Sequence, residues 1–414
     1  MRHFVSKRNL FVGAGFFGLL AALGIAQLVL DRTVAAQSKG AIQAPRFEVD
    51  PLWPKPLPNH WVLGSAIGVW VDASDHIWII HRSSATLAAN EKPLELKTGE
   101  CCAGAPPVLE FDQEGNLLRH WGGPGQGYEW PDSNHGIFID YKGNVWIGGN
   151  GGPDSQVLKF TKDGKFLMQV GKKGARRKPG AKAGTNEGDV ADFAGGSNDE
   201  QNFGRVAKIF VDAKENEAYV ADGYLNKRVA VLDADTGKMK RWWGAYGNKP
   251  DDTPLPAYDP AAPPAQQFRN PVHCADMSAD RFLYVCDRVG DRLQGFTPDG
   301  KFVKEAFYEK ETKNAGSVWD IAFSRDAQQK YIFMADGVNE KVKIIDRQTL
   351  QELTTFGDGG RQPGQFYGVH SIATDSKGNL YTTETYEGKR VQKFLYKGIA
   401  PVTKQNQGTV WPSR

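Results

Sequence analysis

The hydrophobic positions of this chain follow a short pattern that recurs six times after residue 60. Each copy begins with an apolar strand ending near Asp or Ser, continues through a polar turn into an aromatic or β-branched strand, and closes with a Val-x-x-Phe type of strand. Apolar and polar side chains alternate with a period of two, and Asp-Gly, Lys-Gly and Thr-Gly pairs separate the segments, which predicts β-hairpins. The first strands are expected at 67–72, 135–140, 207–212, 273–278, 319–324 and 370–375.

Repeated units of this kind predict an all-β protein, a six-bladed β-propeller of four-stranded antiparallel blades, over residues 61–397. The sixth copy stops after a third strand at 390–396, whereas a strand at 46–50 remains unassigned within the segment 37–60. We therefore predict that this N-terminal strand completes the sixth blade and closes the ring. Two insertions, 172–200 and 247–267, are expected to form long surface loops near one face, and residues 398–414 to form a C-terminal tail.

The first 36 residues follow a different pattern. A basic start (Arg2, Lys7, Arg8) precedes an apolar run of 21 residues, 10–30, which ends near the small residues of 34–36. This predicts an apolar helix that serves either as an export signal, cleaved after residue 35 or 36, or as a retained membrane anchor. We expect an exported protein, periplasmic or extracellular, that contacts a membrane only through this segment if it is retained.

Composition excludes two further classes of protein. The chain has 414 residues, of which 40% are hydrophobic and 47 are glycine, so it has enough apolar residues for a large core and is not mainly disordered. With the four bases and one acid of residues 1–36 set aside, 47 basic and 47 acidic residues remain. A neutral body has no basic field for a phosphate backbone, so no nucleic-acid partner is expected.

Histidines recur in register in every second copy of the pattern. Counting back five residues from the Asp or Ser that ends each first strand gives Ile67, His135, Ala207, His273, Trp319 and His370. The innermost strands of a propeller begin beside the central channel, so the three histidines are expected to point inward about a pseudo-threefold axis. Three imidazoles with one open position are typical of catalytic zinc, although copper, iron and nickel accept the same ligands. The alternative is three structural histidines that make ordinary hydrogen bonds.

The second strands end toward the same face and carry further polar groups, in the segments 81–82, 222–224, 286–288 and 384–386. Arg82 and Arg288 are suited to binding a carboxylate through two points. Tyr224 is a poor base at the ordinary tyrosine pKa of about 10, but a neighbouring arginine and a metal-bound substrate favour its phenolate. The alternative is that Tyr224 only packs and that the arginines only hold loops.

These residues resemble a known family. Residues 221–228, Ala-Asp-Gly-Tyr-Leu-Asn-Lys-Arg, resemble the Asp-Gly-Tyr-x-Asn-x-Arg segment of peptidyl-α-hydroxyglycine α-amidating lyase, the propeller half of the peptide-amidating enzyme. The stretches 134–137, 272–274 and 369–371 resemble that family's three zinc-histidine segments, and 79–82 resembles the strand that delivers its first active-site arginine. The resemblance covers about residues 60–397. More broadly, the chain is similar to NHL-repeat propellers, many of which only bind.

The resemblance implies a zinc lyase that cleaves an N-acyl-α-hydroxyglycine, or a related carbinolamide, to an amide and glyoxylate. Zinc on the three histidines would bind the substrate hydroxyl, Tyr224 would take its proton, and Arg82 and Arg288 would hold the carboxylate. The alternative is a non-catalytic NHL-repeat propeller that binds a protein or glycan outside the cytoplasm.

The chain departs from the family at several points. Ser371 stands where the family has an Asp associated with its structural calcium, which puts a central calcium in doubt, and Leu225 replaces a half-cystine. The sequence shows no copper monooxygenase domain, so we expect a separate hydroxylating enzyme to make the substrate. That substrate is a peptide ending in α-hydroxyglycine or another 2-hydroxy-acylamino compound.

Four cysteines leave room for two disulfides in an exported protein. Cys101 and Cys102 lie in a loop between the second and third strands of the first copy, where a vicinal bridge competes with free thiols or a metal contact. Cys274 and Cys286 lie on neighbouring strands, and a three-residue turn at 279–281 would place them opposite each other. Buried reduced thiols are the alternative for this second pair.

Overall fold

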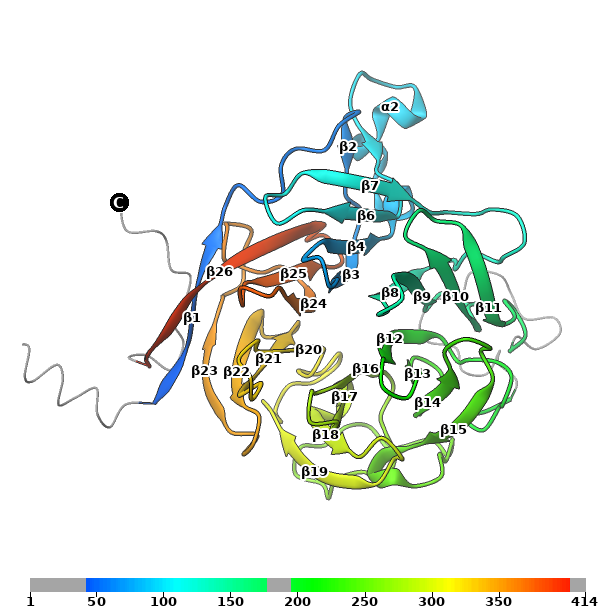
Figure 1. Ribbon diagram of the computed structural model, residues 1–414, viewed down its shortest axis with the longest axis vertical. Coiled ribbons are helices and arrows are strands. Elements are labelled where there is room, and N and C mark those ends of the chain that lie inside the picture. Colours follow the sequence, from blue (N-terminus) through cyan, green and yellow to red (C-terminus); the bar gives the residue numbers. More distant parts are fainter. Residues whose placement is uncertain (1–41, 177–194, 403–414) are drawn as a thin grey trace, which may run out of the picture.

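Six antiparallel four-stranded sheets surround a central axis as the blades of a propeller (Figure 1). The computed structural model describes residues 42–176 and 195–402, and the predicted export helix lies outside these residues. The predicted all-β six-bladed propeller is confirmed. Over the described ranges, we find no helix with both the length and the apolar character needed to cross a bilayer.

Blades one to five each run in chain order across their sheet, starting from the strand nearest the axis. Blade one consists of β3 (Ala66–Val71), β4 (Ile77–His81), β6 (Val108–Phe111) and β7 (Leu117–Trp121), and blade two of β8 (Asn134–Ile139), β9 (Asn144–Gly149), β10 (Gln156–Thr161) and β11 (Phe166–Gly171). Blade three consists of β12 (Val206–Asp212), β13 (Glu217–Asp222), β14 (Arg228–Asp233) and β15 (Met239–Trp243), and blade four of β16 (Val272–Met277), β17 (Leu283–Asp287), β18 (Arg292–Phe296) and β19 (Phe302–Phe307). Blade five consists of β20 (Asp320–Phe323), β21 (Tyr331–Asp336), β22 (Lys341–Asp346) and β23 (Glu352–Phe356).

Blade six joins the two ends of the described chain. Its strands are β24 (Val369–Thr374), β25 (Leu380–Glu384), β26 (Arg390–Pro401) and, on the outside, β1 (Gln43–Asp50). The pairing of β1 with β26 is antiparallel, from Gln43 opposite Pro401 to Asp50 opposite Lys393, and Figure 1 shows the two strands side by side. The predicted closure of the ring by an N-terminal strand is therefore confirmed, and β26 runs further than the expected 390–396.

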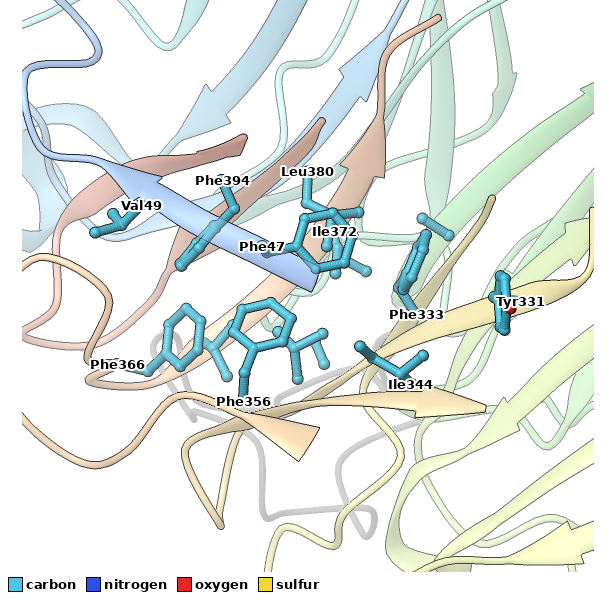
Figure 2. Close-up of a cluster of buried hydrophobic side chains, with 14 of the residues drawn as sticks. Phe47, Val49, Tyr331, Phe333, Ile344, Phe356, Phe366, Ile372, Leu380 and Phe394 are labelled. Atoms are coloured by element: carbon cyan, nitrogen blue, oxygen red, sulfur yellow. The ribbon is translucent and has the colours of Figure 1, made fainter. Parts of the chain in front are cut away.

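Side-chain packing secures the same closure. Phe47 of β1 enters an apolar cluster between blades five and six, shown in Figure 2, and its ring lies 5.2 Å from that of Phe333 and 5.4 Å from that of Phe356. Aromatic pairs at such distances contribute beyond the area that they bury. The N-terminal strand is thus held both by its backbone pairing and by the core of the preceding blade.

The repeated sequence pattern has a physical basis in the inner hairpins. In blades one, two and six, the Asp that directly follows the innermost strand accepts a hydrogen bond from the aromatic side chain six residues later, in the second strand. The pairs are Asp72 with Trp78 (3.2 Å), Asp140 with Trp146 (2.9 Å) and Asp375 with Tyr381 (2.9 Å). Because these aromatic rings are fully buried, the carboxylates satisfy polar atoms that would otherwise be costly to bury.

An insertion between β4 and β6 adds a small subdomain to blade one. It contains η1 (Ser83–Thr86), η2 (Ala89–Glu91), α2 (Pro93–Leu96) and β5 (Ala103–Gly104), which pairs in parallel with β2 (Trp61–Val62). Two more short helices, η4 (Ala245–Gly247) and η5 (Arg288–Gly290), follow β15 and β17.

Both of the disulfides that the sequence left open are formed. Cys101 and Cys102 are bridged within the insertion of blade one, and Cys274 of β16 is bridged to Cys286 of β17. The second pair occupies directly opposite positions of the hairpin, whose turn bonds Ser278 to Phe282 across three residues, as predicted.

Candidate metal centre and active site

Three buried histidines converge at the centre of the ring. His135, His273 and His370 come from β8, β16 and β24, the innermost strands of blades two, four and six. Their ring centroids are 4.8, 4.8 and 5.1 Å apart, and one nitrogen from each ring lies within 4.8 Å of the others. The structure therefore brings together the three side chains that the sequence register selects.

A local irregularity of each inner strand positions its histidine. The pairing register shifts between Asn134 and Ile137 in blade two, between Val272 and Cys274 in blade four, and between Val369 and Ile372 in blade six. Each histidine lies inside one of these shifts. Bulges of this kind redirect a side chain out of the regular alternation, which here turns the imidazoles toward the axis.

The remaining members of the sequence register supply the partners of the histidines. Nδ1 of His135 donates to the carbonyl oxygen of Ala207 at 2.7 Å, Nδ1 of His273 to that of Trp319 at 2.6 Å, and Nδ1 of His370 to that of Ile67 at 2.7 Å. Each histidine of an even blade thus bonds to the equivalent position of the next odd blade.

These bonds fix the tautomer of each imidazole. A carbonyl oxygen only accepts, so Nδ1 carries the proton and Nε2 presents its lone pair. Metal-binding histidines are commonly oriented by a bond of this type on the other ring nitrogen. Gly136 permits the approach in blade two, because a Cβ there would lie 2.5 Å from the oxygen of Ala207.

The three imidazoles are held neutral. Burial lowers the pKa of His135 and of His273 well below the usual range. Neighbouring histidines and the positive charge of Arg288 contribute less to both shifts, and the charge of Arg82 contributes to that of His135. Burial, followed by the same arginines, lowers the pKa of His370 to about 3. A metal ligand has to be the neutral imidazole, so this environment favours ligation over protonation.

Tyr224 bridges two of the histidines. Its hydroxyl lies 2.9 Å from Nε2 of His135 and 3.0 Å from Nε2 of His273. The phenol has one proton, so it donates to one of these two lone pairs at a time. A cation shared by the three imidazoles would satisfy every Nε2 at once, and the donor set therefore fits a transition metal.

A rigid loop delivers Tyr224. Asp222, at the end of β13, accepts from Nε of Arg228 at 2.8 Å and from Nδ2 of Asn226 at 2.7 Å, and all three residues are fully buried. Gly223 lets this loop pass close to blade four, since a Cβ at that position would lie 2.1 Å from both the nitrogen and the oxygen of Val272. The sequence Asp-Gly-Tyr-x-Asn-x-Arg thus describes an anchored loop.

Arg288 lies against the same phenol. Its Nη1 donates to the Tyr224 hydroxyl at 3.2 Å, and its guanidinium stacks over the Trp319 ring with 4.6 Å to the centroid. Arg288 is 7% exposed, so its charge acts in a largely dry environment.

Arg82 lies on the other side of the site, between blades one and two. Its Nη2 donates to Oδ1 of Asn150 at 2.9 Å, and the same oxygen accepts from Oγ of Ser133 at 2.8 Å. The charge of Arg82 reaches the centre, because it contributes to the lowered pKa of both His135 and His370.

Two acidic residues that were expected at this face form ion pairs with arginines of their own blades. Asp287 pairs with Arg292 at 2.7 Å and Glu384 with Arg390 at 2.6 Å, in the same way that Asp222 pairs with Arg228. Each acid ends a second strand, and its arginine begins the third strand of the same blade. These pairs hold the loops that follow the second strands and leave the centre to histidine, tyrosine and arginine.

A lysine occupies the channel next to the histidines. A cavity of about 10 Å³ is lined by the three histidines together with Lys208, Asp320 and Ser371. Nζ of Lys208 lies 2.6 Å from Oδ1 of Asp320 and 3.0 Å from Oδ2 of Asp276, while Oγ of Ser371 donates to Oδ2 of Asp320 at 2.5 Å.

This cluster does not fit a calcium ion. Burial opposes the charge of Lys208, but the two carboxylates outweigh it and raise the pKa of the ammonium, so Lys208 is the cation of this site. Cys274, which lies near the same carboxylates, is bridged to Cys286 and offers no thiolate. The structure thus gives a physical reason to doubt a central calcium, in addition to the presence of Ser371 in place of the family's Asp.

Sequence reasoning did not assign a role at the site to Trp319, Asn150 or Lys208. Trp319 falls in the histidine register, which marked its position but not its contact with Arg288. Lys208 is a charged residue within an apolar inner strand, and this unusual position could have indicated a role in the central channel. Asn150 follows β9 and has no distinguishing pattern around it.

Comparisons with known proteins give a weak sequence similarity. No family model matches the chain. It is 23% identical over 337 residues to peptidylglycine alpha-amidating monooxygenase of Rattus norvegicus, covering 78% of this chain and 30% of that protein, and equally identical to the Mus musculus protein, of which 29% is covered. The chain therefore spans less than a third of the length of these relatives. Among solved structures, virginiamycin B lyase from Staphylococcus aureus aligns with a TM-score of 0.45 at 13% identity over 88% of this chain and 94% of that chain. A streptogramin B lyase aligns with a TM-score of 0.45 at 14% identity, over 86% and 98% of the two chains.

Proposed function

We propose that this protein is a metal-dependent lyase of the amidating-lyase type, which cleaves an N-acyl-α-hydroxyglycine or a related carbinolamide to an amide and glyoxylate. One observation carries the proposal: the Tyr224 hydroxyl lies within 3.0 Å of Nε2 of two histidines and 3.2 Å from the guanidinium of Arg288. The proposed base, two of the proposed metal ligands and a proposed carboxylate-binding cation are therefore in mutual contact. The weak similarity to amidating monooxygenases agrees with this chemistry.

His135, His273 and His370 would hold the metal, and we propose zinc because neutral imidazole suits it and three ligands leave an open position. When bound, zinc supplies Lewis acidity that makes a hydroxyl group more acidic at neutral pH. Copper, iron and nickel accept the same three ligands.

Tyr224 is the proposed general base. Its oxygen faces the centre of the histidine cluster, and the guanidinium of Arg288 stabilises its anionic form. A phenolate at this position accepts the proton of a substrate hydroxyl within hydrogen-bonding distance. The anchored loop around Asp222 and Arg228 keeps the oxygen in place, which is what positioning a catalytic base requires.

Arg288 and Arg82 are the proposed carboxylate-binding residues. They approach the centre from opposite sides, Arg288 beside Tyr224 and Arg82 beside Asn150. A guanidinium binds a carboxylate through two parallel hydrogen bonds, and this geometry orients the α-carbon that carries the reacting hydroxyl.

The reaction balances without a further reactant. The substrate hydroxyl gives its proton to Tyr224, its oxygen forms the aldehyde carbonyl, and the bond between the α-carbon and the amide nitrogen breaks. The electron pair of that bond goes to nitrogen, which takes a proton back from Tyr224. The products are a primary amide and glyoxylate. A hydroxylation reaction has to supply the substrate, and we propose that both reactions take place outside the cytoplasm.

The test is product formation from N-benzoyl-α-hydroxyglycine. Zinc-loaded protein should release glyoxylate and benzamide in equal amounts, well above the rate of the uncatalysed reaction. Absence of both products from fully zinc-loaded protein, with this substrate and with an α-hydroxyglycine peptide, would contradict the proposal. That outcome would favour the alternative of a non-catalytic NHL-repeat propeller that binds a protein or glycan.

A further inference from the structure

A cavity of about 410 Å³ opens beside the candidate active site. Leu225 and Val289 line it, and each directly follows a site residue, Tyr224 and Arg288. Asn270, also part of the lining, donates to the carbonyl oxygens of Gly223 and Asn226, both at 2.8 Å, and so joins the cavity wall to the tyrosine loop. The cavity has a volume typical of small-molecule sites.

The lining of this cavity carries more positive than negative charge. Three basic residues, Arg176, Lys227 and Arg269, face one acidic residue, Asp252. Asp252 is already used, because it accepts from the nitrogen of Ser197 at 2.6 Å and from its Oγ at 2.5 Å.

Lys227 and Arg269 bond to neutral oxygens. Nζ of Lys227 donates to the carbonyl oxygen of Thr253 at 2.9 Å and to Oε1 of Gln267 at 3.2 Å, and Nη1 of Arg269 donates to the carbonyl oxygen of Pro256 at 2.9 Å. Among residues 42–176 and 195–402, neither side chain forms an ion pair with a carboxylate, and Asp252 and Asp251 act on Lys227 through space. Lys227 is only 8% exposed, and burial lowers its pKa. A buried cation of this kind gains from an anionic ligand.

The rest of the lining is apolar. Leu225, Pro254, Leu255 and Val289 contribute hydrocarbon surface next to the charged groups. A ligand that matches both parts has a short apolar chain and a terminal anion. If Arg288 and Arg82 hold the carboxylate of the α-hydroxyglycine part of an N-acyl substrate, its acyl group is free to extend from the site into a neighbouring cavity.

We propose that this cavity binds the acyl part of the substrate, and that the acyl part carries a second carboxylate recognised by Lys227 and Arg269. The inference rests on the proposed lyase function and narrows its substrate class to N-acyl-α-hydroxyglycines whose acyl chain ends in an anion, such as an N-glutaryl compound. The carboxylate of α-hydroxyglycine then binds at Arg288 and Arg82, and the carboxylate of the acyl chain binds at Lys227 and Arg269.

Substrate preference tests the proposal. Glyoxylate release is measured with N-glutaryl-α-hydroxyglycine and with its neutral isostere, in which the terminal carboxylate is a carboxamide. The wild type should favour the anionic substrate by at least about tenfold in kcat/KM, since charge-assisted bonds are lost with the amide. In the double variant Lys227→Gln/Arg269→Gln the ratio should fall to near one. The matched control is Lys249→Gln, an exposed lysine of the insertion 247–267 that is not part of the cavity lining, which should keep the wild-type ratio.

A binding measurement separates this inference from the lyase proposal. Calorimetry with glutaramate, the amide product, and with the neutral glutaramide needs no turnover. Wild-type protein should bind glutaramate at least about tenfold more tightly than glutaramide, and the double variant should lose this difference. Equal affinity of the wild type for the two ligands, or a kcat/KM ratio within twofold of one, would overturn the inference. Failure to release glyoxylate from either substrate would instead contradict the lyase, with the binding result still deciding the role of the cavity.

Discussion

The hydroxyl of Tyr224 lies 2.9 Å from Nε2 of His135, although 89 residues separate them in the chain. The histidine begins the innermost strand of blade two and the tyrosine follows the second strand of blade three, so their contact depends on the packing of neighbouring blades. His273 of blade four completes the bridge at 3.0 Å. The candidate site is therefore a property of the assembled ring, and changes that loosen contacts between blades should disturb it.

The first prediction concerns the base. Tyr224→Phe removes the only atom that Tyr224 presents to Nε2 of the histidines and keeps the ring, so the fold and the metal should be retained. Loss of general base catalysis should lower kcat by about 100-fold or more. Steady-state glyoxylate release at equal metal content measures this, and turnover within about threefold of the wild type would remove Tyr224 from the role of base.

A second prediction concerns the glycine that precedes the tyrosine. Gly223→Ala would place a Cβ 2.1 Å from the backbone of Val272, so the loop or blade four has to move. We expect this variant to lose activity and to lower Tm, because small displacements of a catalytic group are costly. Gly359→Ala is the control: its Cβ would have 4.0 Å to Glu340, and Tm and activity should stay unchanged. Equal behaviour of the two variants would contradict the close approach of blades three and four.

The buried ion pair below the tyrosine loop allows a third test. Arg228→Met leaves Asp222 as an unpaired charge in a fully buried position, which should lower the free energy of unfolding by about 3–5 kcal/mol. Lys142→Gln breaks the exposed pair with Asp235 and should leave the free energy of unfolding almost unchanged, because solvent screens this pair. Urea unfolding of the two variants provides the measurement. A loss below about 1 kcal/mol in Arg228→Met would refute an anchoring role for this pair.

The two disulfides should differ in their effect on stability. The bridge between Cys274 and Cys286 spans 12 residues and both cysteines are fully buried, so Cys274→Ala/Cys286→Ala should reduce the free energy of unfolding by about 2–4 kcal/mol. Cys101→Ser/Cys102→Ser opens a bridge between adjacent residues in an exposed loop, which closes almost no chain. Its effect should be much smaller. Denaturant titrations decide, and the reverse order would contradict the loop-closure argument.

Much of the fold could be predicted from the sequence because each blade has to meet the same packing and hydrogen-bonding requirements. The Asp that ends an inner strand and the aromatic residue six positions later recur because each buried indole or phenol needs an acceptor, as in Asp140 and Trp146. The unassigned strand around Phe47 could be assigned to blade six because the sixth copy of the pattern contained only three of its four strands. The histidine register followed from the same repetition.

Other parts of the site left no pattern in the sequence. The bonds from the histidines to Ala207, Trp319 and Ile67 use backbone carbonyl groups, which any residue provides. Asp287 has the register of a site residue, and only the three-dimensional structure shows that Arg292 engages it. The 410 Å³ cavity is built from segments far apart in the chain, so no local spacing predicts it.

The dependence of glyoxylate release on bound metal decides whether the three histidines form a catalytic metal site. Metal-free wild-type protein is titrated with zinc, and bound zinc and the rate of glyoxylate release from N-benzoyl-α-hydroxyglycine are measured in the same samples, beside His273→Ala. We predict that the rate rises in proportion to bound zinc and reaches its maximum near one zinc per chain, while His273→Ala binds less zinc and stays inactive. Release that is independent of zinc, or no release at full zinc occupancy, would contradict a metal-dependent lyase centred on the three histidines.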